Sequence, residues 1–306
     1  MAVLIVGLFA AYKMMDAKTP SATDSTDTGD SVIMLIDRTS AEVAALSYRL
    51  GEGDTYEFSI RPDKGAWAYA DEPHFPLNQT TVGTMAAAIC RIGAYRHLED
   101  GDTGEYGFDT PDLTVTVGYT DGTECRYAIG DVNTVTGYRY FKDLDSGAVY
   151  TIAAALYDYF DYTIDELFVY DTLPGDIESA HITSFTVAEG DSVTEITDAD
   201  AVTAMYAAFT ALAPSAYADS YADETESAAY GIGACTLTVS YKRAVQITDA
   251  SGAASTTRIP ATFSIDFGNT AEDGRVYYKL STSDVIYLAE AEKVSALISA
   301  ASPTEE

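Results

Sequence analysis

The sequence predicts an α+β fold made of two tandem repeats, each an antiparallel β-sheet with one covering α-helix. Three observations predict it: a segment that occurs twice, an alanine-rich helical pattern ahead of each copy, and short strand patterns around each helix. The 306 residues suffice for two domains of roughly 150 residues each. Hydrophobic residues make up 47% of the chain and charged residues 21%, which excludes a disordered protein.

The duplicated segment is twelve residues long and aligns without gaps. Residues 106–117 and 230–241 are identical at five positions, a Tyr, a Gly, a Leu, a Thr and a Val. The flanks agree as well, because a glycine precedes a tyrosine by twenty positions in the first copy and by nineteen in the second, at Gly130 and Tyr150 and at Gly268 and Tyr287. Agreement inside and outside the segment indicates a duplication.

An apolar pattern with helical spacing precedes each copy. In residues 80–97 and 198–212 apolar side chains recur three and four positions apart, which is the spacing of one helix face. These side chains are Val82, Met85, Ala86, Ile89 and Ile92, and then Val202, Met205, Tyr206, Phe209 and Leu212. We expect a helix over each range, the first closed by His97 and the second capped by Asp198 and terminated by Pro214.

Strand patterns surround both helices. In the first repeat we expect strands at 43–48, 56–60, 66–69, 114–119 and 126–129, the last two joined by a tight turn at Asp121-Gly122. In the second we expect strands at 182–187, 192–196, 241–248 and 258–267, with residues 249–257 as a longer loop. The patterns leave open whether the two repeats share one sheet.

Changes of composition set the boundaries of the repeats. Leu173-Pro174-Gly175 breaks the strand pattern, so we place the first repeat at 31–172, the second at 173–301 and a tail at 302–306.

The N-terminus predicts attachment to a membrane. Residues 1–12 are apolar without interruption but too few to cross a bilayer, which takes about 20, and residues 16–30 are rich in Ser, Thr and Asp. We expect a truncated membrane anchor or signal segment at 1–15, with the natural start further upstream, and a polar tether at 16–30. This arrangement predicts an extracytoplasmic protein, anchored to the cytoplasmic membrane by its N-terminus. The alternative is that the apolar run is a buried element of the fold.

The charge balance excludes two classes of partner. There are 17 Lys and Arg against 48 Asp and Glu, which gives a formal net charge of −31. Binding to nucleic acid or to an anionic lipid surface depends on clustered basic side chains, so neither is expected, and contact with the membrane is through the anchor only.

No residue is predicted to be catalytic, to bind a cofactor or to ligate a metal. The cysteines are odd in number and far apart, which indicates neither a disulfide framework nor a zinc site, and no local signature joins a cysteine to a histidine. They are Cys90, Cys125 and Cys235, and the histidines are His74, His97 and His181. The acidic loops at 100–105 and 143–147 lack the third alternating ligand of a calcium loop, so turn formation explains them equally well. We expect a protein that is not an enzyme.

Tyrosine is unusually abundant, at 23 residues. The strand tyrosines are Tyr138, Tyr140, Tyr277 and Tyr278, and those after the second helix are Tyr217, Tyr221 and Tyr230. Tyrosine rings stack on sugars and peptides, but they also occupy half-buried strand positions, so both interpretations stay open.

The order of these motifs resembles the bacterial family called domain of unknown function 4340. The residues that carry the resemblance are Trp67, the alanine-rich helix, Tyr106-Gly107-Phe108, Pro111, Leu113, Val115, the Asp-Gly hairpin, Ile129-Gly130, Tyr138, Tyr140 and Val149-Tyr150. The resemblance covers most of residues 32–300 as two copies. The second copy departs at Cys235, where the first has Pro111, and it lacks the strand that bears the tryptophan. The family implies a membrane-anchored envelope protein, in some members an auxiliary component of an ABC transport system linked to gliding motility, and brings no established catalytic residues.

Two functions follow as expectations. The first is a non-enzymatic module that binds an envelope or membrane protein partner, as an accessory component of an ABC transport system. The alternative is a binding protein for cell-wall glycan or a small ligand, for which a tyrosine-lined groove would be the sign. A third, an envelope hydrolase, would show a deep pocket with converging acids of perturbed pKa. The identity of the partner and the oligomeric state stay open.

Overall fold

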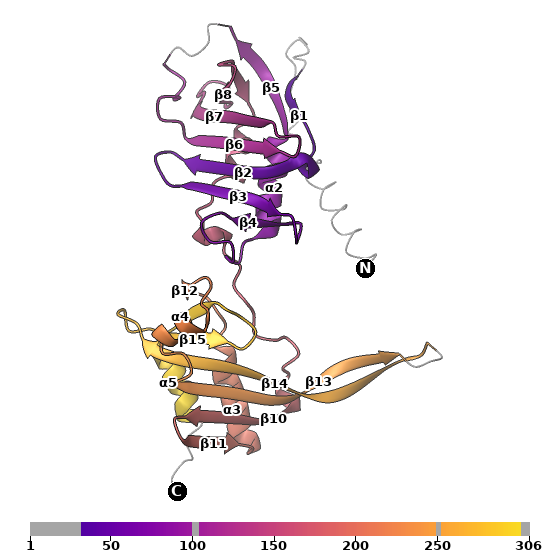
Figure 1. Cartoon of the computed structure of the whole chain (residues 1–306), viewed down its shortest axis with the longest axis vertical. Coiled ribbons are helices and arrows are strands. Elements are labelled where there is room, and N and C mark those ends of the chain that lie inside the picture. The colour runs from indigo at the N-terminus through magenta and orange to yellow at the C-terminus, as the bar shows by residue number, and fades with distance from the viewer. Residues whose placement is uncertain (1–31, 100–103, 249–251, 301–306) are drawn as a thin grey trace.

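The computed structural model describes residues 32–99, 104–248 and 252–300 (Figure 1). The predicted anchor at 1–15, the tether at 16–30 and the tail at 302–306 lie outside these residues. The described chain folds into two separate antiparallel sheets with helices, an α+β architecture as predicted. The two halves of the chain therefore do not share one continuous sheet.

The first sheet has nine strands in the order β1-β5-β9-β8-β7-β6-β2-β3-β4. Their bounds are β1 Ile33–Asp37, β2 Val43–Leu50, β3 Thr55–Arg61, β4 Ala66–Tyr69, β5 Arg91–Leu98, β6 Leu113–Tyr119, β7 Glu124–Val132, β8 Arg139–Asp143 and β9 Val149–Ile152. Helix α2 (Gln79–Ile89) buries Val82, Met85, Ala86 and Ile89 in the core. Asn78 caps it by accepting a hydrogen bond from the backbone N–H of Thr81.

The second sheet has seven strands in the order β11-β10-β13-β14-β15-β16-β12. Their bounds are β10 Ile182–Glu189, β11 Ser192–Ile196, β12 Tyr217–Asp219, β13 Cys235–Thr248, β14 Ala254–Thr270, β15 Val276–Leu280 and β16 Ile286–Ala289. Three helices accompany them, α3 (Ala199–Thr210), α4 (Glu224–Ala229) and α5 (Ala291–Ala300). Asp198 caps α3 as predicted, since its carboxylate accepts from the N–H groups of Asp200 and Ala201.

The two sheets share an order of strands. The run β5-β9-β8-β7-β6-β2-β3 of the first sheet corresponds, strand for strand along the chain, to β12-β16-β15-β14-β13-β10-β11 of the second. The first sheet adds β1 and β4 at its two edges. The second adds α4 and α5 and lengthens the hairpin of β13 and β14.

The similar segments 106–117 and 230–241 make the same contact in both sheets. The N–H of Asp131 donates to the carbonyl of Tyr106 at 2.9 Å, and that of Asn269 donates to the carbonyl of Tyr230 at 2.8 Å. The glycine before each donor, Gly130 or Gly268, lets the chains approach, because a Cβ there would overlap the tyrosine carbonyl. The repeated tyrosines and glycines therefore hold each sheet to its preceding loop.

We call each sheet together with its helices a unit. Aromatic and carboxylate contacts join the two units. Tyr217 of β12 stacks on Phe168 of the connecting segment, with ring centroids 4.0 Å apart, and donates from its hydroxyl to Asp165 at 2.7 Å. The hydroxyl of Tyr287 donates to Asp171 at 2.7 Å. The connecting segment, residues 153–181 between β9 and β10, is thus held to the second unit through β12 and β16.

Two local predictions are wrong. The first helix ends at Ile89, and residues 91–98 form β5, so His97 lies on a strand and does not close a helix. Ile92 and Ala94 are buried at alternate positions, and Gly93, which disfavours a helix interior, lies between them. The second error is the loop expected at 249–257, since β14 already begins at Ala254 and pairs with β13 up to Thr248.

Candidate functional site

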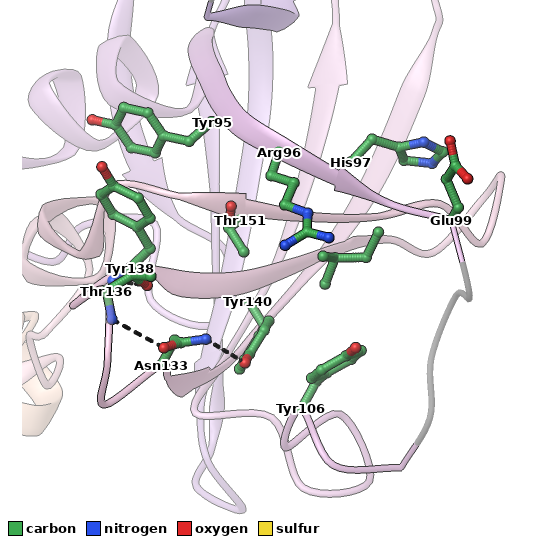
Figure 2. Close-up of a pocket in the computed structure, with 11 residues that line it drawn as sticks. Tyr95, Arg96, His97, Glu99, Tyr106, Asn133, Thr136, Tyr138, Tyr140 and Thr151 are labelled. Atoms are coloured by element: carbon green, nitrogen blue, oxygen red, sulfur yellow. Dashed lines mark hydrogen bonds between the residues drawn. The ribbon is translucent and has the colours of Figure 1, made fainter. Parts of the chain in front are cut away.

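A cavity of about 850 Å³ lies on the first sheet, where β5, β8, β9 and the loop after β7 meet (Figure 2). Four of its lining side chains are tyrosines, Tyr95, Tyr106, Tyr138 and Tyr140. Its volume lies within the range of about 300–1,000 Å³ that is usual for small-molecule sites.

The tyrosines form two pairs. Tyr95 of β5 stacks on Tyr138 with ring centroids 4.1 Å apart and planes inclined by 12°. Tyr106, from the duplicated segment, lies 4.2 Å from Tyr140 of β8 at 30°. Pairing fixes the rings in place, so the walls of the cavity are pre-formed.

A polar turn positions one of these pairs. Asn133 donates from its side-chain amide to the Tyr140 hydroxyl at 2.7 Å, and its carbonyl oxygen accepts from the N–H groups of Val135 and Thr136, each at 3.0 Å. The turn closes at Gly137, whose φ of 74° a residue with a side chain rarely adopts. Asn133 therefore links the shape of this loop to the orientation of Tyr140.

Charged groups lie between and beside the pairs. Arg96 of β5 points its guanidinium group into the cavity, and His97 and Glu99 lie at its rim (Figure 2). Arg96 makes no ion pair, side-chain hydrogen bond or cation–π contact with any residue that the structure describes. Arg49 and Arg91 of the same sheet also have no ion pair within the described residues, but neither of them lines this cavity.

A second exposed feature is the hairpin of β13 and β14, which projects from the body (Figure 1). Strand β10 pairs with β13 only as far as Tyr241, and β15 reaches β14 only at Ile265 and beyond. Between these limits, residues 242–248 and 254–261 form a ribbon of two strands, and no other described strand lies beside it. We call this ribbon the arm.

The outer part of the arm carries few charges and two exposed isoleucines. Ile247 is 49% exposed and Ile259 40% exposed. Arg243 and Arg258 lie at its base, 3.8 Å from Asp176 and 3.9 Å from Glu178. Between residues 244 and 257 the only charged residue in the sequence is Asp249.

The cysteines and histidines do not converge. Burial raises the pKa of the thiols of Cys90 and Cys235, which disfavours the reactive thiolate. His74 stacks on Tyr221 with centroids 4.2 Å apart, and His181 lies 3.3 Å from Glu178. Of the six residues, only His97 reaches the cavity.

The acidic loop at 143–147 is a turn between β8 and β9. Asp143 accepts from the N–H groups of Asp145 and Ser146, and Asp145 pairs with Arg126 at 2.7 Å. The other loop, at 100–105, lies largely outside the described residues. In the part of the chain that the structure describes, no three His, Cys, Asp or Glu side chains are grouped as a metal site.

The seven tyrosines singled out from the sequence have different environments. Tyr138 and Tyr140 line the cavity, whereas Tyr278 is buried in the core and Tyr217 joins the two units. Sequence reasoning missed Tyr95, because its segment was assigned to the helix. Gly93, which disfavours a helix interior, was the signal in the sequence that could have found the strand.

Comparison with known protein families places the chain in one of them. The family model described as "Domain of unknown function (DUF4340)" matches residues 67–231, a continuous stretch of more than half the chain that runs from β4 to the end of α4. Neither a curated protein nor a solved structure matches significantly. Within the described residues no helix is long and apolar enough to cross a membrane.

Proposed function

The chain belongs to the domain of unknown function 4340 family, and from that premise we propose that it is a non-enzymatic binding module of the cell envelope. In this proposal residues 1–15 belong to a longer anchor in the cytoplasmic membrane, the body is extracytoplasmic, and its partner is a membrane component of an ABC transport system. The apolar N-terminal run and the acidic composition support the location. The family resemblance supports the kind of partner.

The arm is the observation that carries partner binding. A two-stranded ribbon has unpaired backbone N–H and C=O groups along both outer edges, and natural proteins usually protect such edges with charges, bulges or a covering element. The arm between residues 244 and 257 has a single charge in a chain of which 21% is charged. An isolated ribbon is also marginally stable in water. These features suit a strand of a partner that adds to an open edge of the arm.

Site-specific crosslinking in the host tests this proposal. A photoreactive benzoylphenylalanine would replace Ile247 on the arm, or Val193 on β11, which is 67% exposed and serves as the matched control. We expect an adduct with a membrane subunit of a transport system from position 247 and none from position 193. No adduct at 247, or the same adducts from both positions, would contradict the proposal.

A shortened arm supplies the second control. Replacing residues 243–259 by Asp-Gly, the turn that joins β6 and β7, keeps the pairing of Lys242 with Pro260. Circular dichroism should remain that of a folded protein, because the removed residues contribute little to the core. Chemical crosslinking of this variant in cells should recover no transport subunit above the level of an anchor-only protein.

The cavity favours the alternative, a binding protein for cell-wall glycan or a small ligand. It is the tyrosine-lined space that the sequence interpretation named as the sign of this function. Soluble glycan fragments would be titrated into the protein and into Tyr138→Ala, with changes in tyrosine fluorescence as the readout. Binding that the substitution weakens would favour this function, and unaltered spectra with all fragments would oppose it.

We also propose that the two units arose by duplication. The shared order of seven strands and the two equivalent tyrosine–glycine contacts support this origin. The continuous family match neither requires nor excludes it.

A further inference from the structure

We propose that the cavity of the first sheet binds a sugar that bears a carboxylate, with Arg96 as the group that recognises the carboxylate. This inference rests on the ligand-binding alternative above and goes beyond it by naming the class of ligand. It does not depend on the arm.

The charge of the molecule supports the assignment. Acids outnumber basic residues 48 to 17, so most arginines have acidic neighbours within reach. Arg38, Arg126 and Arg275 make ion pairs of 2.9, 2.7 and 2.6 Å on the surface. Arg96 has no such partner among the described residues, although Glu99 lines the same cavity. Arg49 and Arg91 are unpaired as well, but of the three only Arg96 lines the cavity, so it is available there to a carboxylate of a ligand.

The geometry of guanidinium suits an oxyanion such as a carboxylate. Its planar fork of N–H donors matches the two oxygens of a carboxylate and forms two parallel hydrogen bonds. The negative field of the whole protein repels anions from most of its surface. A ligand anion would therefore gain at Arg96 an attraction that the rest of the surface does not offer.

The walls favour a sugar as the carrier of the carboxylate. Two pairs of tyrosine rings flank Arg96, and such rings present apolar surface to the C–H faces of a sugar (Figure 2). The hydroxyl groups of Tyr95, Tyr106 and Tyr138 have no hydrogen-bond partner within the described residues, so they can bond to sugar hydroxyls. A simple carboxylic acid would use the arginine but not these walls.

Titration calorimetry with matched ligands tests the inference. The acidic probes are glucuronate, galacturonate and N-acetylmuramate, each paired with its methyl ester, which keeps the sugar and removes the charge. Benzoate serves as a carboxylate without a sugar. The proteins are the wild type, Arg96→Gln, and Arg49→Gln as the control, since Arg49 is an exposed arginine of the same sheet, on β2, and does not line the cavity.

We expect at least one acidic sugar to bind at least tenfold more tightly than its ester and than benzoate. Arg96→Gln should remove that tenfold preference and leave the ester unchanged, and Arg49→Gln should change neither. Equal binding of acid and ester would overturn the inference while the ligand-binding function stands. Equal binding of benzoate and the acidic sugars would also overturn it, because the sugar would then be irrelevant. Absence of binding by all probes would overturn the inference, and the glycan-fragment titration would then decide separately whether the cavity binds any ligand.

Discussion

The two units share an arrangement of seven strands, which we call the frame, and they differ at two of the connections between strands. In both, a tyrosine carbonyl accepts from the residue that follows a glycine, and seven strands take the same order. Tyr106 borders an open cavity in the first unit, whereas α4 directly precedes the corresponding Tyr230 in the second. The central hairpin ends in a tight turn at Asp121-Gly122 in the first unit and extends as the arm in the second.

The corresponding space in the second unit is filled by polar contacts. Lys279 of β15 donates to the Ala222 carbonyl at 3.0 Å and to the Ser227 hydroxyl of α4 at 3.2 Å. Tyr230, the equivalent of Tyr106, donates to Asp219 at 3.0 Å, and burial together with this bond raises the pKa of Tyr230 to about 12. One unit thus offers a cavity and the other an arm, so the same frame presents two different surfaces.

The largest expected effect comes from the shared contact. Gly130→Ala and Gly268→Ala each place a Cβ against a tyrosine carbonyl, and we expect a loss of about 3 kcal/mol in the free energy of unfolding. Urea unfolding would be followed by the fluorescence of Trp67, the only tryptophan, which lies in the first unit, and by far-ultraviolet circular dichroism of the whole chain. The fluorescence transition should shift for Gly130→Ala and shift less for Gly268→Ala.

A third glycine gives the control of opposite sign. Gly83 lies in α2 with no atom near the position of an added Cβ, so Gly83→Ala should stabilise the first unit by up to about 1 kcal/mol. If all three substitutions shift the urea unfolding transition equally, the tyrosine–glycine contact does not hold each sheet to its preceding loop.

The sequence predicted the frame because repeated local signals determine it. The capped second helix, the Asp-Gly turn and the strands at 43–48, 56–60 and 66–69 all depend on short-range patterns, and the structure confirms them. It did not predict β5, where alternation over a few residues competed with a stronger helical rhythm upstream. The cavity could not be predicted from the sequence for a related reason. Tyr95 and Tyr106 meet Tyr138 and Tyr140 only through the pairing of β5, β9 and β8, which short-range patterns do not show.

An intermediate effect is expected where the units meet. Tyr217→Ala removes the stack on Phe168 and the hydrogen bond to Asp165, and should cost about 2 kcal/mol. Tyr217→Phe keeps the stack and should cost about 1 kcal/mol. Calorimetry should show the two units melting further apart in Tyr217→Ala. Tyr159→Ala, at a residue that is 44% exposed on the first unit, is the control, and an equal separation in that variant would contradict a specific role for the stack.

The smallest effect concerns the pH dependence of the two hairpin turns. Hydrogen bonds from Thr123, followed by Arg38, lower the pKa of Asp121 from 3.8 to about 2. Because the folded pKa lies below the unfolded one, the ionised group stabilises the fold above about pH 4, and this contribution is lost as the pH falls towards 2. Asp121→Asn should therefore lower the urea concentration at the midpoint of unfolding at pH 6, and it should not lower it at pH 2.

Asp273, in the turn between β14 and β15, sharpens the comparison. A hydrogen bond from the Arg275 side chain, followed by one from its backbone, lowers the pKa of Asp273. Arg275 is two residues away, whereas Arg38 lies 83 residues from Asp121. A contact between near neighbours persists in part in the unfolded chain, so Asp273→Asn should alter the pH dependence less than Asp121→Asn. An equal change in both variants would mean that Arg38 adds nothing to the pH dependence of the turn of the first unit.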